Sequence, residues 1–259
     1  MRIAGFRDRL RGGAPLAGTF VKTPSIQVME VLALSDLDFV CLDTEHAPVD
    51  RAGMDACLAL ARAMDFPVVV RVGEAGAREI LQALDSGAVG VVVPHVWSAE
   101  KAEAVARAAH FGLGGRGFAG GTRWAGHGAR SMADVLSQDP QSVVIAQIEE
   151  PEGVEACEAI AAVPNIDALF VGPADLSVSY GHDSLDNPDL KAALARVGAA
   201  ARAAGKGFAS FTPTSAMAAD WARDYGMHMV LVGSELGWMR AGANATAQAF
   251  HAASGRERG

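Results

Sequence analysis

Eight short apolar runs alternate with alanine-rich stretches of helical spacing along almost the whole chain, and this alternation restricts the fold most. Runs such as Val68-Val69-Val70 and Val91-Val92-Val93 are apolar without alternation, which is typical of parallel strands buried on both faces. We expect strands at 16–21, 39–43, 67–72, 90–95, 143–149, 168–172, 207–211 and 229–233, with helices near 25–34, 53–64, 74–86, 98–110, 152–161, 187–204, 214–225 and 235–252. Eight β–α units in 259 residues predict an α/β fold, a single (β/α)8 TIM barrel spanning residues 1–259.

Two segments add to this plan. Residues of about 3–11 carry Ile3, Phe6 and Leu10 with amphipathic spacing, which predicts an N-terminal covering helix rather than a secretory signal. Residues of about 111–142 interrupt the alternation, and we expect a long functional loop there. A doubly wound sheet is disfavoured because no glycine-rich dinucleotide loop follows the first run.

Composition excludes several classes of function. The net charge of −8, without a basic run, argues against a nucleic-acid partner. No apolar run approaches the ~18–20 residues of a membrane helix, so no membrane partner is expected. The odd set of three cysteines lacks zinc spacing and indicates free thiols in a reducing cytoplasm.

Acidic residues stand where the predicted strands end, and barrel active sites lie at that end. Asp43, Glu45, Glu149 and Asp175 all occupy such positions, with Arg71 as the strongest neighbouring cation. Taken singly, each acid could instead cap a helix N-terminus. Together they would resist ionising, and a divalent cation such as Mg²⁺ or Mn²⁺ relieves that conflict.

Histidine and lysine positions bear on the mechanism. His46 follows the second strand and could be a general base or a hydrogen-bonded surface residue. His127 lies in the long loop and could touch a substrate, whereas the remaining histidines, His95 included, are expected to be structural or solvent-exposed. Lys22 alone among four lysines could form a Schiff base, and the four carboxylates favour metal chemistry over it.

The segments Asp43-Thr44-Glu45-His46-Ala47-Pro48, Arg71-Val72, 84–91, 147–149 and 171–177 resemble, in this order, motifs of the HpcH/HpaI aldolase family. The resemblance covers about residues 15–240. It implies a class II-type, metal-dependent aldolase on a (β/α)8 barrel, similar to 4-hydroxy-2-oxoheptanedioate or 2-dehydro-3-deoxyglucarate aldolases. Such an enzyme reversibly cleaves a 4-hydroxy-2-oxoacid into pyruvate, or a related 2-oxoacid, and an aldehyde through a metal-stabilised enolate.

The resemblance also implies roles for individual residues. A divalent cation (Mg²⁺, Mn²⁺ or Co²⁺) would be bound by Glu149 and Asp175. His46 would be the base, and Arg71 would steady the enolate oxygen. Asp85 would raise the basicity of His46. The substrate would be bound by Gln147, the backbone of Ala174, Arg71 and Asp175. The resemblance also implies supporting roles for Asp43, Glu45, Gly172, Pro173, Arg123 and His127.

Asp85 ends the predicted helix 74–86 and so lies at the face of its own barrel opposite His46, which it can reach only across a subunit interface. The family is homo-oligomeric, typically a hexamer built as a trimer of dimers, and the helix 235–252 suits packing on a neighbour. Residues 111–130 depart from the family's Pro-Pro-x-G pattern. Arg116, Arg123 and His127 are therefore candidates for binding a polar or anionic aldehyde.

Other activities use similar barrels. A CoA-ester lyase would need a basic patch for the nucleotide, which the sequence lacks. A citrate-synthase-like or 2-oxoacid decarboxylase activity stays open. A non-catalytic metabolite-binding barrel would lack some of the catalytic residues, whereas His46, Arg71, Glu149 and Asp175 are all present.

Overall fold

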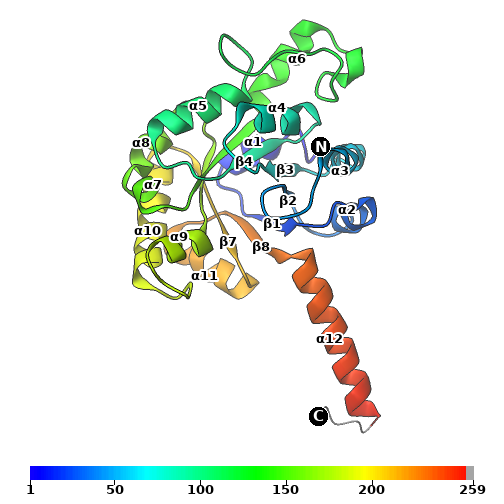
Figure 1. The fold of residues 1–259 in the computed structure, drawn as a ribbon, viewed down its shortest axis with the longest axis vertical. Coiled ribbons are helices and arrows are strands. Elements are labelled where there is room, and N and C mark those ends of the chain that lie inside the picture. The colour runs from blue at the N-terminus through cyan, green and yellow to red at the C-terminus, as the bar shows by residue number, and fades with distance from the viewer. Residues whose placement is uncertain (255–259) are drawn as a thin grey trace.

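The computed structural model describes residues 1–254, and its strands form one closed parallel barrel (Figure 1). The strands are β1 (Leu16–Val21), β2 (Val40–Asp43), β3 (Val68–Arg71), β4 (Gly90–Val93), β5 (Val143–Ile148), β6 (Ala168–Val171), β7 (Gly207–Thr212) and β8 (Met229–Ser234). Each strand pairs with its neighbours in sequence, and β8 closes the barrel against β1. The predicted (β/α)8 fold is confirmed.

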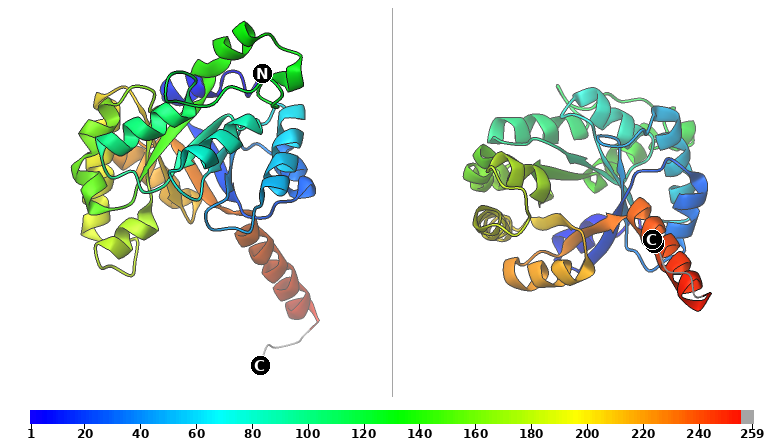
Figure 2. Two further views of the ribbon diagram at one scale, coloured as in Figure 1. Left: turned by 45° about the horizontal axis from the view of Figure 1, so that its top comes forward. Right: turned by 60° about the horizontal axis from the view of Figure 1, so that its bottom comes forward.

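Helices surround the barrel, as the end-on view in Figure 2 shows. They are α1 (Phe6–Arg11), α2 (Ile26–Ala33), α3 (Arg51–Ala63), α4 (Ala77–Asp85), α5 (Ala99–Ala109), α6 (Met132–Gln138), α7 (Pro151–Glu155), α8 (Cys157–Ala162), α9 (Pro173–Ser179), α10 (Pro188–Ala203), α11 (Ser215–Tyr225) and α12 (Glu235–Ala253). Ser98, Thr214 and Ser234 cap α5, α11 and α12 by accepting hydrogen bonds from backbone N–H groups of the first turn.

Apolar side chains fill the barrel and the layer between strands and helices. Val69, Val91 and Val92 are fully buried, as expected for strands covered on both faces. Helix α1 closes the amino-terminal end of the barrel with Phe6 and Leu10, which are 1% and 0% exposed. The predicted covering helix is therefore present, although it begins at Phe6 rather than near residue 3.

The segment 111–142 is not the open loop that the sequence suggested. It contains α6 and two short 3-10 turns, η1 (Gly126–Gly128) and η2 (Asp139–Gln141). Because it connects α5 to β5, it lies at the amino-terminal end of the barrel. In Figure 1, α6 accordingly stands at the end of the molecule opposite α12.

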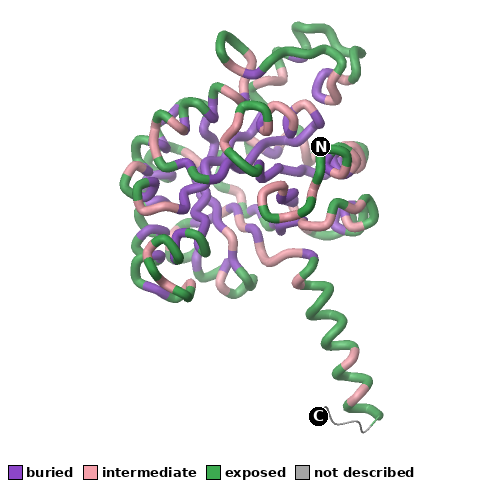
Figure 3. The backbone as a smooth tube through the Cα atoms, in the orientation of Figure 1, coloured by how far each residue is buried: buried purple, intermediate pink, exposed green. Residues whose placement is uncertain are grey.

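Helix α12 projects away from the barrel, and Figure 3 shows it exposed over almost its whole length. Its first residue, Glu235, is buried and accepts hydrogen bonds from the backbone N–H groups of Lys22 and Thr23, at 2.8 and 2.7 Å. Trp238 and Phe250 are 42% and 69% exposed. Among the residues described, no helix combines the length and apolarity needed to cross a membrane.

Candidate active site

A cavity of about 390 Å³ opens at the carboxyl-terminal ends of the strands. It is lined by Phe20, Lys22, His46, Arg71, Gln147, Phe170, Gly172, Pro173, Ala174, Asp175, Phe211, Pro213, Gly233, Ser234 and Gly237. Eight of the residues singled out from the sequence thus meet around one space: Lys22, His46, Arg71, Gln147, Gly172, Pro173, Ala174 and Asp175. They come from β1, β2, β3, β5 and β6 or from the segments directly after these strands.

Arg71 is held rigidly at this cavity by Asp43. The two residues are register partners on β3 and β2. Asp43 accepts hydrogen bonds from Arg71 Nε at 3.0 Å and Nη2 at 2.7 Å, and both residues are buried. Burial raises the pKa of Asp43, but the hydrogen bonds and charge of Arg71 outweigh it and hold that pKa below its usual range. Asp43 therefore positions the guanidinium, and the Oδ2 atom of Asp43 also lies 3.4 Å from Lys22 Nζ.

Glu149 sits in a cradle of groups that orient both of its oxygens. Its Oε1 accepts a hydrogen bond from the backbone N–H of His95 at 2.8 Å, and its Oε2 accepts one from the Gln147 side chain. A Cβ added at Gly172 would lie 2.7 Å from Oε2, so only glycine leaves room for the carboxylate. Gln147 and Glu149 share a face of the strand, as their spacing predicted.

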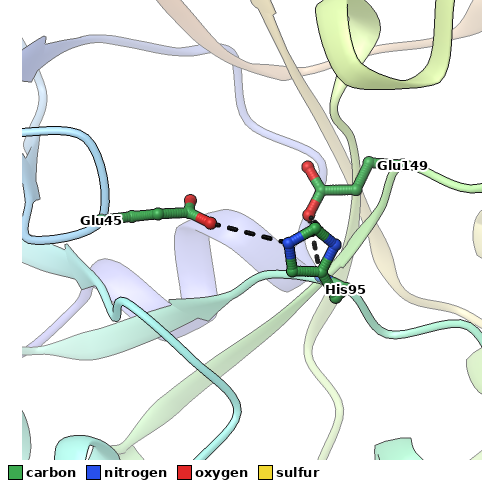
Figure 4. A group of neighbouring side chains, drawn as sticks. All are labelled: Glu45, His95 and Glu149. Carbon is green, nitrogen blue, oxygen red and sulfur yellow. Dashed lines mark hydrogen bonds and ion pairs between the residues drawn. The ribbon is translucent and has the colours of Figure 1, made fainter. Parts of the chain in front are cut away.

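His95 is the site residue that sequence reasoning missed. It follows β4 with a left-handed backbone (φ 57°), and its Nδ1 lies 3.2 Å from Glu149 and 2.5 Å from Glu150. Its Nε2 lies 3.9 Å from Glu45 (Figure 4). Its position at a strand end was visible in the sequence. The turn that aims its imidazole at the carboxylates was not.

Glu45, His95 and Glu149 bring one ligand atom each within 4.8 Å of one another, and the surroundings fit a cation. Burial raises the pKa of Glu149 and of Glu45. The buried Oε1 of Gln147 has no hydrogen-bond partner among residues 1–254. Asp175 lines the neighbouring cavity from the first turn of α9. These oxygen donors, with one imidazole, suit a divalent ion.

His46 and Asp85 are far apart within one chain. The His46 side chain is 55% exposed at the cavity mouth, with Nε2 3.8 Å from Glu45. Asp85 ends α4 at the other end of the barrel, where it accepts hydrogen bonds from Arg116 Nη2 at 2.5 Å and Nε at 3.2 Å. A contact between Asp85 and His46 therefore requires a second copy of the chain.

The loop residues proposed for the aldehyde also lie at that other end. Arg123 pairs with Asp55 at 2.8 Å and donates to the Ser86 carbonyl at 3.0 Å. His127 lies exposed in η1. Neither residue lines the cavity of its own chain.

Comparison with known proteins agrees with this geometry. Residues 16–241 match the family described as HpcH/HpaI aldolase/citrate lyase. The chain belongs to this family. A hydroxypyruvate/pyruvate aldolase from Paraburkholderia phytofirmans is 35% identical to this HpcH/HpaI member over 242 residues, 90% of this chain and 92% of the relative. A 5-keto-4-deoxy-D-glucarate aldolase from Klebsiella pneumoniae is 34% identical, covering 85% and 86%.

The fold agrees as closely. The crystal structure of an HpcH/HpaI aldolase/citrate lyase family protein from Burkholderia cenocepacia superposes with a TM-score of 0.90 at 34% identity, covering 96% of this chain and 99% of that one. This HpcH/HpaI member is an aldolase, a carbon–carbon lyase, and its family is metal-dependent.

Proposed function

We propose that this HpcH/HpaI aldolase reversibly cleaves a 4-hydroxy-2-oxoacid into pyruvate, or hydroxypyruvate, and an aldehyde. The observation that carries the proposal is a cavity lined by a rigid guanidinium (Arg71) and a carboxylate (Asp175), with the oriented carboxylate of Glu149 hydrogen-bonded to Gln147 in the wall of that cavity. The names of the relatives support the 2-oxoacid half of the reaction.

Glu149 and Asp175 would hold the divalent cation, with the Glu45–His95 edge of the cluster beside it. When bound, such an ion supplies Lewis acidity to the ketone oxygen of the 2-oxoacid. Arg71 donates hydrogen bonds to the same oxygen as negative charge develops there. Because Asp43 fixes the guanidinium group of Arg71, this side chain needs little reorganisation during the reaction. Phe20, Phe170 and Phe211 keep that region of the cavity poor in water.

His46 accepts the proton of the 4-hydroxyl group as the C3–C4 bond breaks, and the electron pair of that bond passes into the enolate of the 2-oxoacid. A proton taken up at C3 then gives pyruvate. Glu45, 3.8 Å from His46 Nε2, stabilises the imidazolium that results. Backbone groups at Ala174, in the first turn of α9, face the substrate carboxylate in this arrangement.

The test is release of pyruvate from 4-hydroxy-2-oxoacids by protein stripped with EDTA and reloaded with Mg²⁺, Mn²⁺ or Co²⁺. We expect each reloaded form to recover activity, and His46→Ala or Arg71→Ala to lower kcat/KM by about 100-fold or more. Unchanged turnover in both variants would overturn the proposal. Metal-independent turnover that is trapped by borohydride and lost in Lys22→Arg would establish a Schiff base instead.

We further propose that the working enzyme is a homo-oligomer in which Asp85 of one subunit supports His46 of another. The exposed apolar residues of α12, Trp238 and Phe250 among them, suit packing on a neighbouring copy. Mixed oligomers test this. His46→Ala and Asp85→Ala should each be inactive, and co-refolded mixtures should regain part of the activity because some interfaces hold both native residues. Mixtures that stay inactive would contradict the shared site.

A further inference from the structure

A second cavity lies at the amino-terminal end of the barrel, under the segment 111–142, and shares no lining residue with the active site. Its volume is about 540 Å³. Arg62 reaches it from the last turn of α3, and both Trp124 and Arg130 reach it from the segment between α5 and α6. The proposed reaction gives these residues no task.

The two arginines of this cavity carry unneutralised charge. Arg62 Nη1 donates to the Gly87 carbonyl at 3.2 Å, and Arg130 donates to the Trp124 carbonyl at 3.4 Å and to the Gln138 side chain. Within residues 1–254 neither forms an ion pair with a carboxylate. Burial lowers the pKa of Arg62, and the positive charges of Arg130 and Arg123 lower it further. Arg62 and Arg130 therefore repel one another while neither has an ion-pair partner of its own among the described residues, whereas Arg123 is paired with Asp55.

A separate feature of the same cavity points to a missing acceptor. Trp124 is 6% exposed, and its indole Nε1 is buried without a hydrogen-bond partner among the described residues. Buried donors of this kind are normally paired. Asp65 also lines the cavity, but its oxygens already accept hydrogen bonds from the backbone N–H groups of Arg2, at 2.5 Å, and Ile3, at 3.1 Å.

We propose that this cavity binds a small oxyanion, a carboxylate or a phosphate, between the guanidinium groups of Arg62 and Arg130, with the Trp124 indole as a neutral donor. Guanidinium forks match the planar carboxylate and the phosphate group, and an acceptor oxygen at the indole would satisfy the buried N–H. The site is distinct from that of the 2-oxoacid substrate because it lies at the other end of the barrel.

Isothermal titration calorimetry of the full chain tests the site, with inorganic phosphate and succinate as separate probes and sodium chloride holding the ionic strength constant. We expect saturable binding of at least one probe. Tighter binding of phosphate would assign a phosphate-bearing ligand, and tighter binding of succinate would assign a dicarboxylate. No saturable binding of either probe would overturn the proposal.

Variants locate the binding. Arg62→Gln and Arg130→Gln should each weaken it about tenfold or more, and Trp124→Phe, which keeps an aromatic ring but removes the N–H, about threefold. Arg78→Gln, an equal loss of charge at an exposed position of α4, is the matched control and should bind as the native chain does. Native affinity in both Arg62→Gln and Arg130→Gln would refute the site.

Folding is checked by circular dichroism and the melting temperature of each variant. Arg62 also donates a hydrogen bond to the Gly87 carbonyl, so the Arg62→Gln variant could unfold. In that case the affinity of Arg130→Gln, a substitution at an exposed position, tests the site. Crystals soaked in selenate give an independent readout. An anomalous peak between Arg62 and Arg130 is expected. The absence of this peak in crystals where selenate fully occupies other sites would count against the proposal.

Discussion

The buried pair of Asp43 and Arg71 gives the active site its rigidity. Both charges are out of water, so each depends on the other for its hydrogen bonds. Removing one partner leaves the other charge buried and unpaired. The pair therefore makes a prediction about stability as well as about catalysis.

Asp43→Asn should lower the free energy of unfolding at pH 7 by about 3–5 kcal/mol. The folded-state pKa of Asp43 lies below the unfolded value of about 3.9, so its stabilisation is present above that pH and disappears as the pH falls below it. The difference from the native chain should thus shrink on acidification. Urea unfolding at several pH values measures this, with exposed Asp36→Asn as the control. A difference that does not change with pH would be inconsistent with an ionised Asp43.

His95 leads to a prediction about the choice of metal. Its imidazole adds a nitrogen donor to a cluster of oxygen donors, and nitrogen favours Co²⁺ over Mg²⁺. His95→Gln should weaken Co²⁺ binding about tenfold and leave Mg²⁺ binding nearly unchanged. Calorimetry on EDTA-stripped protein measures both, and His110→Gln, at the other end of the barrel, is the matched histidine control. Equal losses for both metals would show that the imidazole does not select the ion.

The places of most candidate site residues were predictable, because eight parallel strands bring Arg71, Gln147 and Glu149 to one end of the barrel whatever the details of packing. Their exact contacts were not predictable. Asp43 was expected among metal-binding acids and is instead the partner of Arg71. The orientation of the His95 imidazole depends on a left-handed backbone conformation after β4, and no residue pattern in the sequence predicts that conformation.

At the scale of elements, connection matters more than composition. The segment 111–142 was expected to be a functional loop because of its length, and its arginines were candidates for the aldehyde because of the family resemblance. A segment that joins a helix to the next strand lies at the amino-terminal end of its own barrel, so its place in the alternation predicts where it stands. Helix α6 within it could not be foreseen, since its seven residues hold a single buried side chain, Val135.

Helix α1 closes the same end of the barrel, and its contribution can be measured. Leu10 is fully buried and packs so closely on Gly207 that a Cβ there would come within 2.8 Å of Leu10 Cδ1. Leu10→Ala should cost about 2–5 kcal/mol of stability, whereas Val178→Ala, at a position 70% exposed, should cost little. Chemical denaturation gives both values. A loss below 1 kcal/mol would mean that α1 can detach without cost.

At the scale of the whole molecule, the oxyanion cavity is linked to Asp85 through the turn after α4. Three successive carbonyls of that turn accept hydrogen bonds from the oxyanion-cavity side: Asp85 from the Trp124 backbone at 3.3 Å, Ser86 from Arg123 at 3.0 Å and Gly87 from Arg62 at 3.2 Å. An anion that neutralises the repulsion among these arginines would hold the turn, and with it Asp85, in place.

If Asp85 supports His46 of a neighbouring subunit, phosphate should raise the kcat of the assembled enzyme about fivefold, equivalent to about 1 kcal/mol in the barrier, at an unchanged KM for the 2-oxoacid. The measurement is steady-state cleavage over a range of phosphate concentrations at constant ionic strength. Arg62→Gln should lose the phosphate response, and Arg78→Gln should retain it. Phosphate could also compete at the active site, but that effect would raise KM equally in both variants. A kcat independent of phosphate, in a protein shown to bind it, would separate the oxyanion site from catalysis.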